Sequence, residues 1–152
     1  MNAGEIAPNF ILKDESGKDF ELYKNLDQNI LLVFYPKDDT PVCSSQLAHY
    51  NDNIDVLSKN EIKVVGINIG SINSHSDFCK KLNLKFPLLA DEDKKVSKQF
   101  GAINFLGINK RLNVLIGTDR KIVWIASSLS ITYLKSAQII KKTKLLKNKE
   151  MT

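Results

Sequence analysis

The stretch ILLVFY-PKDDTPVC, residues 30–43, decides the fold of this chain. Its first six residues form a continuous apolar run of strand length, as strands buried on both faces of a sheet usually do. Two prolines then stiffen a turn. Residues 44–58 follow with apolar side chains at spacings of three and four, which predict a helix. The stretch therefore places Cys43 where a buried strand ends and a helix begins.

This position favours a reactive sulfur at Cys43. The free N–H groups of a first helical turn attract negative charge, and thiols placed there ionise more readily than ordinary cysteines. Thr40 adds a hydroxyl three residues upstream. Arg111 opens a predicted strand, and in a sheet of this kind it would lie near the end of strand 30–35. Each residue also has an ordinary interpretation: Cys43 as a small buried hydrophobe, Thr40 as a helix cap, and Arg111 as a surface residue at a strand edge.

The rest of the chain alternates strands and helices. Such an order predicts an α/β protein with a largely parallel sheet covered on both faces, and its closing hairpin and helix are typical of a thioredoxin-like sheet. The expected elements are a hairpin of residues 10–12 and 20–22, strands 30–35, 62–69 and 86–90, helices 44–58, 74–82 (capped by Ser74 or Ser76) and 93–100, a second hairpin of residues 111–116 and 122–126, and a final helix 132–147.

Composition bounds the class of protein. A chain of 152 residues with 43% hydrophobic and 26% charged residues is typical of one folded domain, here residues 1–152. No apolar run approaches the length of about 18 that a membrane span needs, and the N-terminus shows no secretory leader, so we expect a cytoplasmic protein without membrane contact. The net charge of +5 comes partly from C-terminal lysines, which we interpret as a solvated helix face. Without a binding motif or interleaved aromatics, we expect no nucleic-acid partner.

The chain has two cysteines, Cys43 and Cys79. They argue against a structural disulfide framework and leave inert thiols, a redox pair or half of a metal site. His75 lies four residues before Cys79 on one helix face, and His49 could complete a four-ligand zinc site with Cys43. The tight cysteine or histidine pairs of zinc sites are missing, so we expect no metal and place both histidines at the surface. A thioredoxin-type dithiol exchanger needs two cysteines separated by two residues, and it is excluded because residues 44–46 after Cys43 are Ser, Ser and Gln.

Residues 34–43 closely resemble the active-site segment of peroxiredoxins, in particular the peroxiredoxin Q, or bacterioferritin-comigratory-protein, subfamily of the AhpC/TSA family. The resemblance implies a thioredoxin fold, with a central mixed sheet flanked by helices and an N-terminal hairpin extension. Further matching positions are Gly4, Ala7, Pro8, Phe10, Leu12, Asp14 and Gly17, then Gly66, Ser74, His75, Phe78, Leu84, residues 86–91, Val96, Phe100 and Gly101, and finally Arg111, residues 114–116, Lys121 and Ile122.

The resemblance also implies roles for the matching residues. Cys43 would be the peroxidatic cysteine, Thr40 would hydrogen-bond the thiolate or the peroxide, Arg111 would stabilise the thiolate and polarise the peroxide, and Pro36 would shield the site from water. The implied activity is the reduction of hydrogen peroxide and organic hydroperoxides through a sulfenic acid. Thioredoxin or a similar dithiol would regenerate the enzyme, a monomer or weak dimer, and no cofactor or metal is needed.

The chain departs from the subfamily's pattern at several points. Ala48 stands where many members carry a second cysteine, Val42 where glycine is common, and Gly117 where an acidic residue is usual, while the loop of residues 102–110 looks shorter. Some members place the resolving cysteine on the later helix, so Cys79 becomes the candidate partner of Cys43 in an intramolecular disulfide.

Two alternatives remain open at this point. In the first, Cys79 packs inward beside Phe78, and an external thiol resolves a one-cysteine peroxidase. In the second, the chain is a non-catalytic thioredoxin-fold module that binds a partner through its basic C-terminal helix.

Overall fold

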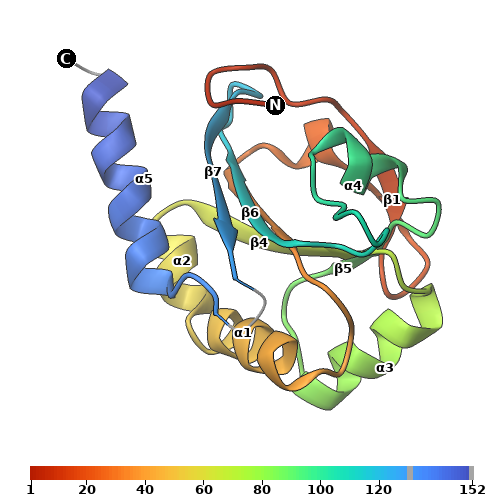
Figure 1. Ribbon diagram of the computed structural model, residues 1–152. Helices are drawn as coiled ribbons and strands as arrows, with labels where there is room; N and C mark the ends of the chain where they lie inside the picture. The colour runs from red at the N-terminus through yellow and green to blue at the C-terminus, as the bar shows by residue number, and fades with distance from the viewer. Residues whose placement is uncertain (130–131, 151–152) are drawn as a thin grey trace.

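The computed structural model describes residues 1–129 and 132–150 (Figure 1). In chain order the elements are β1 (Ile11–Lys13), β2 (Asp19–Glu21), the 3-10 helix η1 (Leu22–Asn25), β3 (Asn29–Phe34), α1 (Pro41–Asp52), α2 (Ile54–Lys59), β4 (Ile62–Asn68), α3 (Ile72–Leu82), β5 (Leu88–Ala90), α4 (Lys95–Gln99), β6 (Arg111–Ile116), β7 (Ile122–Ser128) and α5 (Ser136–Glu150).

The strands form one sheet in the order β2-β1-β5-β4-β3-β6-β7. The three central strands β5, β4 and β3 run parallel, and the other neighbours pair antiparallel. The expectation of a largely parallel sheet is therefore wrong, because the hairpins add antiparallel strands at both edges. The mixed sheet implied by the resemblance is confirmed.

Strand β3 lies near the centre of the sheet and contributes side chains to the hydrophobic core on each face. Ile30, Leu32 and Phe34 pack with residues of α4 and the N-terminal segment. Leu31 and Val33 alternate to the opposite face and pack with residues of α1, α2, α3 and α5. Figure 1 shows α1, α2 and α3 on one side of the sheet and α4 on the other. A continuous apolar run is thus needed because both faces of β3 are covered.

Strand β6 runs antiparallel to β3, with Leu112 opposite Phe34. Leu112, Val114 and Ile116 belong to the core on the α4 side. Arg111, Asn113 and Leu115 alternate to the face that carries α1. The first residue of β6 therefore lies beside the carboxyl end of β3, as the sequence predicts, and on the side of the helix that follows.

The helix expected over residues 44–58 is two helices, and it begins earlier. Asn53 separates α1 from α2, with its side-chain amide donating to the carbonyl oxygen of His49 at 2.8 Å. Because the apolar spacing continues across Asn53, periodicity alone does not reveal the break.

Helix α3 also begins before its expected start. The hydroxyl of Ser71 caps it by accepting from the N–H of Ser74 at 3.1 Å, so the caps proposed at Ser74 and Ser76 are wrong. The earlier start brings Ser74 and His75 into the first turn of α3.

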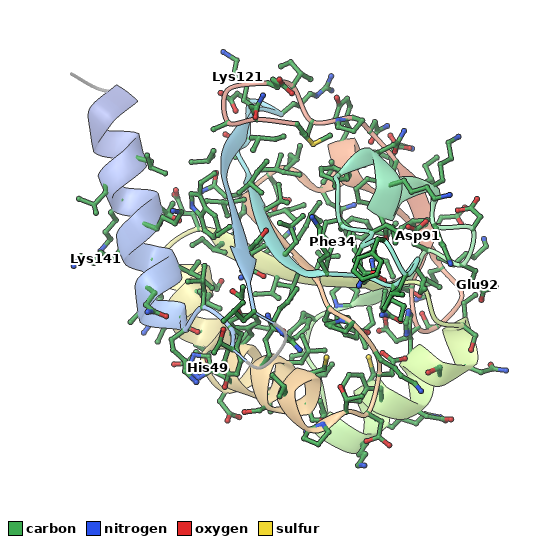
Figure 2. The ribbon with its side chains drawn as sticks, in the orientation of Figure 1. Phe34, His49, Asp91, Glu92, Lys121 and Lys141 are labelled. Atoms are coloured by element: carbon green, nitrogen blue, oxygen red, sulfur yellow. The ribbon has the colours of Figure 1, made fainter. Side chains whose placement is uncertain are left out.

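Helix α5 packs on β7 and extends away from the sheet (Figure 1). The indole of Trp124 donates to the hydroxyl of Thr143 at 3.1 Å and anchors the helix. Lys141 and Lys144 are exposed, and Figure 2 shows Lys141 on the outer side of α5. Within the described residues, no helix has the length and apolar character needed to cross a bilayer.

Candidate active site

Cys43 occupies the first turn of α1. The helix begins at Pro41, which has no N–H to leave unpaired. The first backbone bond of the helix runs from the N–H of Ser44 to the carbonyl of Thr40 at 2.8 Å. The N–H groups of Val42 and Cys43 precede it and have no acceptor within the helix. Cys43 is a free, fully buried thiol at this positive end of the helix.

The guanidinium of Arg111 contacts the sulfur directly. Its Nη2 lies 3.3 Å from Sγ of Cys43, and its Nη1 donates to Oε1 of Gln46 one turn along α1. Arg111 is only 3% exposed, so the interpretation of a surface arginine is wrong. A buried guanidinium within hydrogen-bond distance is placed to donate to the sulfur. The two arms of the guanidinium thus contact two side chains, Cys43 and Gln46, on the same face of α1.

Behind Gln46 lies a chain of buried polar groups that the sequence analysis missed. The Nε2 of Gln46 and the Nδ2 of Asn113 donate to the hydroxyl of Tyr50 at 3.4 and 3.1 Å, and this hydroxyl donates to the carbonyl of Leu134 at 2.7 Å. Burial raises the pKa of Tyr50, so its proton remains available to Leu134. The signals in the sequence were Gln46 beside the apolar stripe of the predicted helix and Asn113 within the apolar run of the predicted strand.

Thr40 and Pro36 lie in the loop between β3 and α1. The hydroxyl of Thr40 donates to the carbonyl of Lys37 at 3.0 Å, so its hydrogen is directed into the loop. Pro36 is half-buried, and its carbonyl accepts from Nδ2 of Asn68 at 3.0 Å. Donation from Thr40 to the sulfur or to a peroxide would require this hydroxyl to rotate.

The same loop carries a buried carboxylate, Asp38. Its Oδ1 accepts from the hydroxyl of Tyr35 at 2.5 Å, and its Oδ2 accepts from the hydroxyl of Ser74 and from Nδ1 of His75, both at 2.6 Å. Burial alone would raise the pKa of Asp38, but the hydrogen bonds from His75, Ser74 and Tyr35 outweigh it and hold the pKa below its usual value. His75 is fully buried, so its expected surface position is wrong: Asp38, distant in sequence, satisfies the imidazole.

Cys79 lies on α3 beside Phe78, in the same core as Cys43. Both cysteines are free thiols. Burial, with smaller contributions from nearby carboxylates, raises the pKa of Cys79 to about 12. Burial and Asp38 raise the pKa of Tyr35 well above its usual value. In the folded state Cys79 is therefore protonated and a weak nucleophile.

His49 faces the start of α5 (Figure 2). Its Nε2 accepts from the N–H of Ser136 at 3.0 Å and lies 3.1 Å from the hydroxyl of the same residue. His49 is half-buried, so the surface position expected for it is only partly right. Because His49 and His75 are bonded to different partners, they do not converge with the cysteines. Among the residues described, no three His, Cys, Asp or Glu side chains gather as a metal-binding group.

Comparisons with known proteins agree with this geometry. Residues 3–125 match the AhpC/TSA family. The chain is 40% identical to chloroplastic peroxiredoxin Q of Triticum aestivum over 101 residues, which cover 66% of this chain and about half (46%) of the plant protein. It is 39% identical to peroxiredoxin Bcp of Escherichia coli over 129 residues, which cover 80% of this chain and 83% of that protein.

A solved structure matches nearly the whole fold. The structure of peroxidoxin BcpB from Mycobacterium tuberculosis superposes with a TM-score of 0.84 at 28% identity and covers 97% of both chains. The family match spans most of the chain and includes both the cysteine at the start of α1 and the arginine at the start of β6. The chain therefore belongs to the AhpC/TSA family, among relatives named peroxiredoxin Q and Bcp.

Proposed function

We propose that the protein is a thiol-dependent peroxidase that reduces hydrogen peroxide and organic hydroperoxides, with Cys43 as its peroxidatic residue. One observation carries the proposal: the 3.3 Å contact between the Arg111 guanidinium and a sulfur in the first turn of α1. Family membership supports the same chemistry.

The chemistry follows from the groups around the sulfur. The Cys43 thiolate attacks one peroxide oxygen, a sulfur–oxygen bond forms and the oxygen–oxygen bond breaks. The product is a sulfenic acid, and the hydroxide or alkoxide that leaves takes a proton to become water or an alcohol. Arg111 and the free N–H groups of the turn stabilise the negative charge before and during this step. Thr40, after rotation of its hydroxyl, donates to the peroxide, and Pro36 limits access of water.

We further propose that Cys79 resolves the sulfenic acid. Its thiol condenses with Cys43–SOH to give a disulfide and water, and thioredoxin or a similar dithiol reduces this disulfide while being oxidised itself. Because the folded Cys79 has a pKa of about 12, resolution requires α3 to open and return the thiol to water. The same burial favours the second candidate, a one-cysteine peroxidase resolved by an external thiol.

Peroxide consumption coupled to a thioredoxin system tests the proposal on wild type, Cys43→Ser and Cys79→Ser. We expect no turnover from Cys43→Ser, and loss of thioredoxin-coupled turnover from Cys79→Ser with retention of a single turnover. Undiminished turnover by Cys43→Ser would refute the peroxidase and leave the non-catalytic binding module.

Peptide mapping without reductant separates the two resolving routes. After one equivalent of hydrogen peroxide, a Cys43–Cys79 cross-link supports intramolecular resolution. A stable sulfenic or sulfinic acid at Cys43 without the cross-link would support the external thiol instead.

The setting of the activity is also proposed. We place a single domain of residues 1–152 in the cytoplasm, as a monomer or weak dimer that uses no cofactor or metal. Sedimentation of the reduced and oxidised protein tests the assembly state.

A further inference from the structure

A single buried carboxylate joins the loop before Cys43 to helix α3. Asp38 is 8% exposed and belongs to the loop, whereas two of its three hydrogen-bond donors, Ser74 and His75, lie in the first turn of α3. The third donor, Tyr35, directly follows β3. Cys79 follows His75 by four residues on the same helix. The carboxylate thus connects the segment that carries one thiol to the helix that carries the other.

This connection is strong because of its chemistry. A carboxylate only accepts, so Nδ1 of His75 carries the hydrogen, and all three bonds are made to a charged acceptor. The carboxylate also lies at the positive end of α3. A second link between the same two elements is weaker. Asp39 and Lys81 form an ion pair, but their side chains are 58% and 63% exposed, and exposed pairs contribute little.

Both thiols are free, lie on different helices and are buried in the same core. We propose that Asp38 is a positioning residue that latches the loop to α3, and that release of this latch is the local opening in which Cys43 and Cys79 meet. The part of the inference that concerns disulfide formation rests on the proposed function. The latch itself does not, because it governs the resting protein as well.

The latch can be tested without peroxide, in a Cys43→Ser background where Cys79 is the remaining thiol. A buried thiol reacts with N-ethylmaleimide in proportion to the population of the open state. Loss of one hydrogen bond to a charged group should raise that population about ten- to a hundredfold. We expect Tyr35→Phe, Ser74→Ala and His75→Leu each to accelerate labelling of Cys79 by this factor. Labelling at the background rate in folded variants would overturn the latch.

Rescue and control variants separate a latch from a general loss of stability. His75→Asn keeps an N–H near the position of Nδ1 and should return labelling toward the background rate. Lys81→Gln removes the exposed pair and should change labelling less than about fivefold. Thr143→Val removes the buried hydrogen bond to Trp124 at α5 and should leave labelling unchanged. Acceleration by Thr143→Val as large as by Ser74→Ala would show general destabilisation and overturn the proposal.

A second measurement uses the native cysteines. After one equivalent of hydrogen peroxide, Ser74→Ala and Tyr35→Phe should form the Cys43–Cys79 disulfide about ten- to a hundredfold faster than wild type. An unchanged rate, with wild type forming the disulfide, would overturn the role of the latch in resolution. If wild type forms no disulfide, resolution by Cys79 is refuted, and the labelling measurement still decides whether the latch exists.

Discussion

Replacement of Arg111 by methionine tests the central contact of the site. Methionine keeps much of the buried volume and removes the charge and the N–H contacts to Sγ of Cys43 and to Oε1 of Gln46. Loss of a donor to a charged acceptor costs about 1.5–3 kcal/mol, and loss of a donor to charge developing in a transition state costs about 2.7–4 kcal/mol. The guanidinium stabilises both the charged sulfur of the resting enzyme and the charge that develops in the transition state. We therefore expect kcat/KM for hydrogen peroxide to fall about 100- to 1,000-fold.

Stopped-flow peroxide consumption measures this fall, and iodoacetamide alkylation of Cys43 in a Cys79→Ser background measures the reactivity of the sulfur alone. Arg120→Met is a matched control. Arg120 is the other arginine of the chain; it belongs to the turn between β6 and β7, and its guanidinium lies over the ring of Tyr23. We expect wild-type kinetics from this control. Arg111→Met also leaves the buried Gln46 without this donor, which should lower the free energy of unfolding by about 1–3 kcal/mol.

The reasoning would be refuted by a folded Arg111→Met protein that consumes peroxide within about fivefold of the wild-type rate. It would be equally refuted if Arg120→Met slowed the reaction as much, because the effect would then reflect overall charge and not the contact at Sγ.

Three further predictions concern stability. Burial lowers the pKa of His49 below 6.5, so the unfolded chain binds more protons, and stability should fall as pH decreases below 6.5. His49→Gln, whose amide oxygen can still accept from Ser136, should remove this part of the pH dependence in urea titrations. Burial raises the pKa of Cys79 from 9.0 to about 12, so at alkaline pH the folded state retains a proton that the unfolded state loses. Stability should therefore decline above pH 9 in wild type more than in Cys79→Ala, as measured by urea midpoints at pH 8 and 10. Tyr50→Phe should lose about 1–3 kcal/mol at constant m-value, because the carbonyl of Leu134 loses its donor and two buried amides lose an acceptor; an unchanged midpoint would contradict this.

Local patterns were sufficient to predict the order of strands and helices. The apolar run of β3, the first hairpin and the strand expected over residues 62–69 are confirmed, as β3, β1 with β2, and β4. The break at Asn53 was missed because apolar spacing continues through it. The share of parallel pairing was overestimated because pairing depends on which edge each hairpin joins, and no short segment specifies that.

The site was predictable only as far as it is contiguous in sequence. The segment from Pro36 to Cys43 could be recognised directly, and Arg111 through the resemblance, although the sequence alone favoured a surface position for it. The buried place of His75 depends on Asp38, 37 residues earlier, and polar side chains without a sequence neighbour look exposed. The same reason hid the partners of Gln46 until the fold brought β6 to α1.

The pairing of β6 with β3 leaves the reactive centre no tolerance for a register shift of even one residue. Leu112 is opposite Phe34, and the side chains of β6 alternate between the two layers, so a shift of a single position would turn the guanidinium toward α4. Deletion of one residue within β6 would thus disconnect the sulfur from its cation without touching either side chain. Length changes during evolution or engineering are better accommodated in the connection before the strand than inside it.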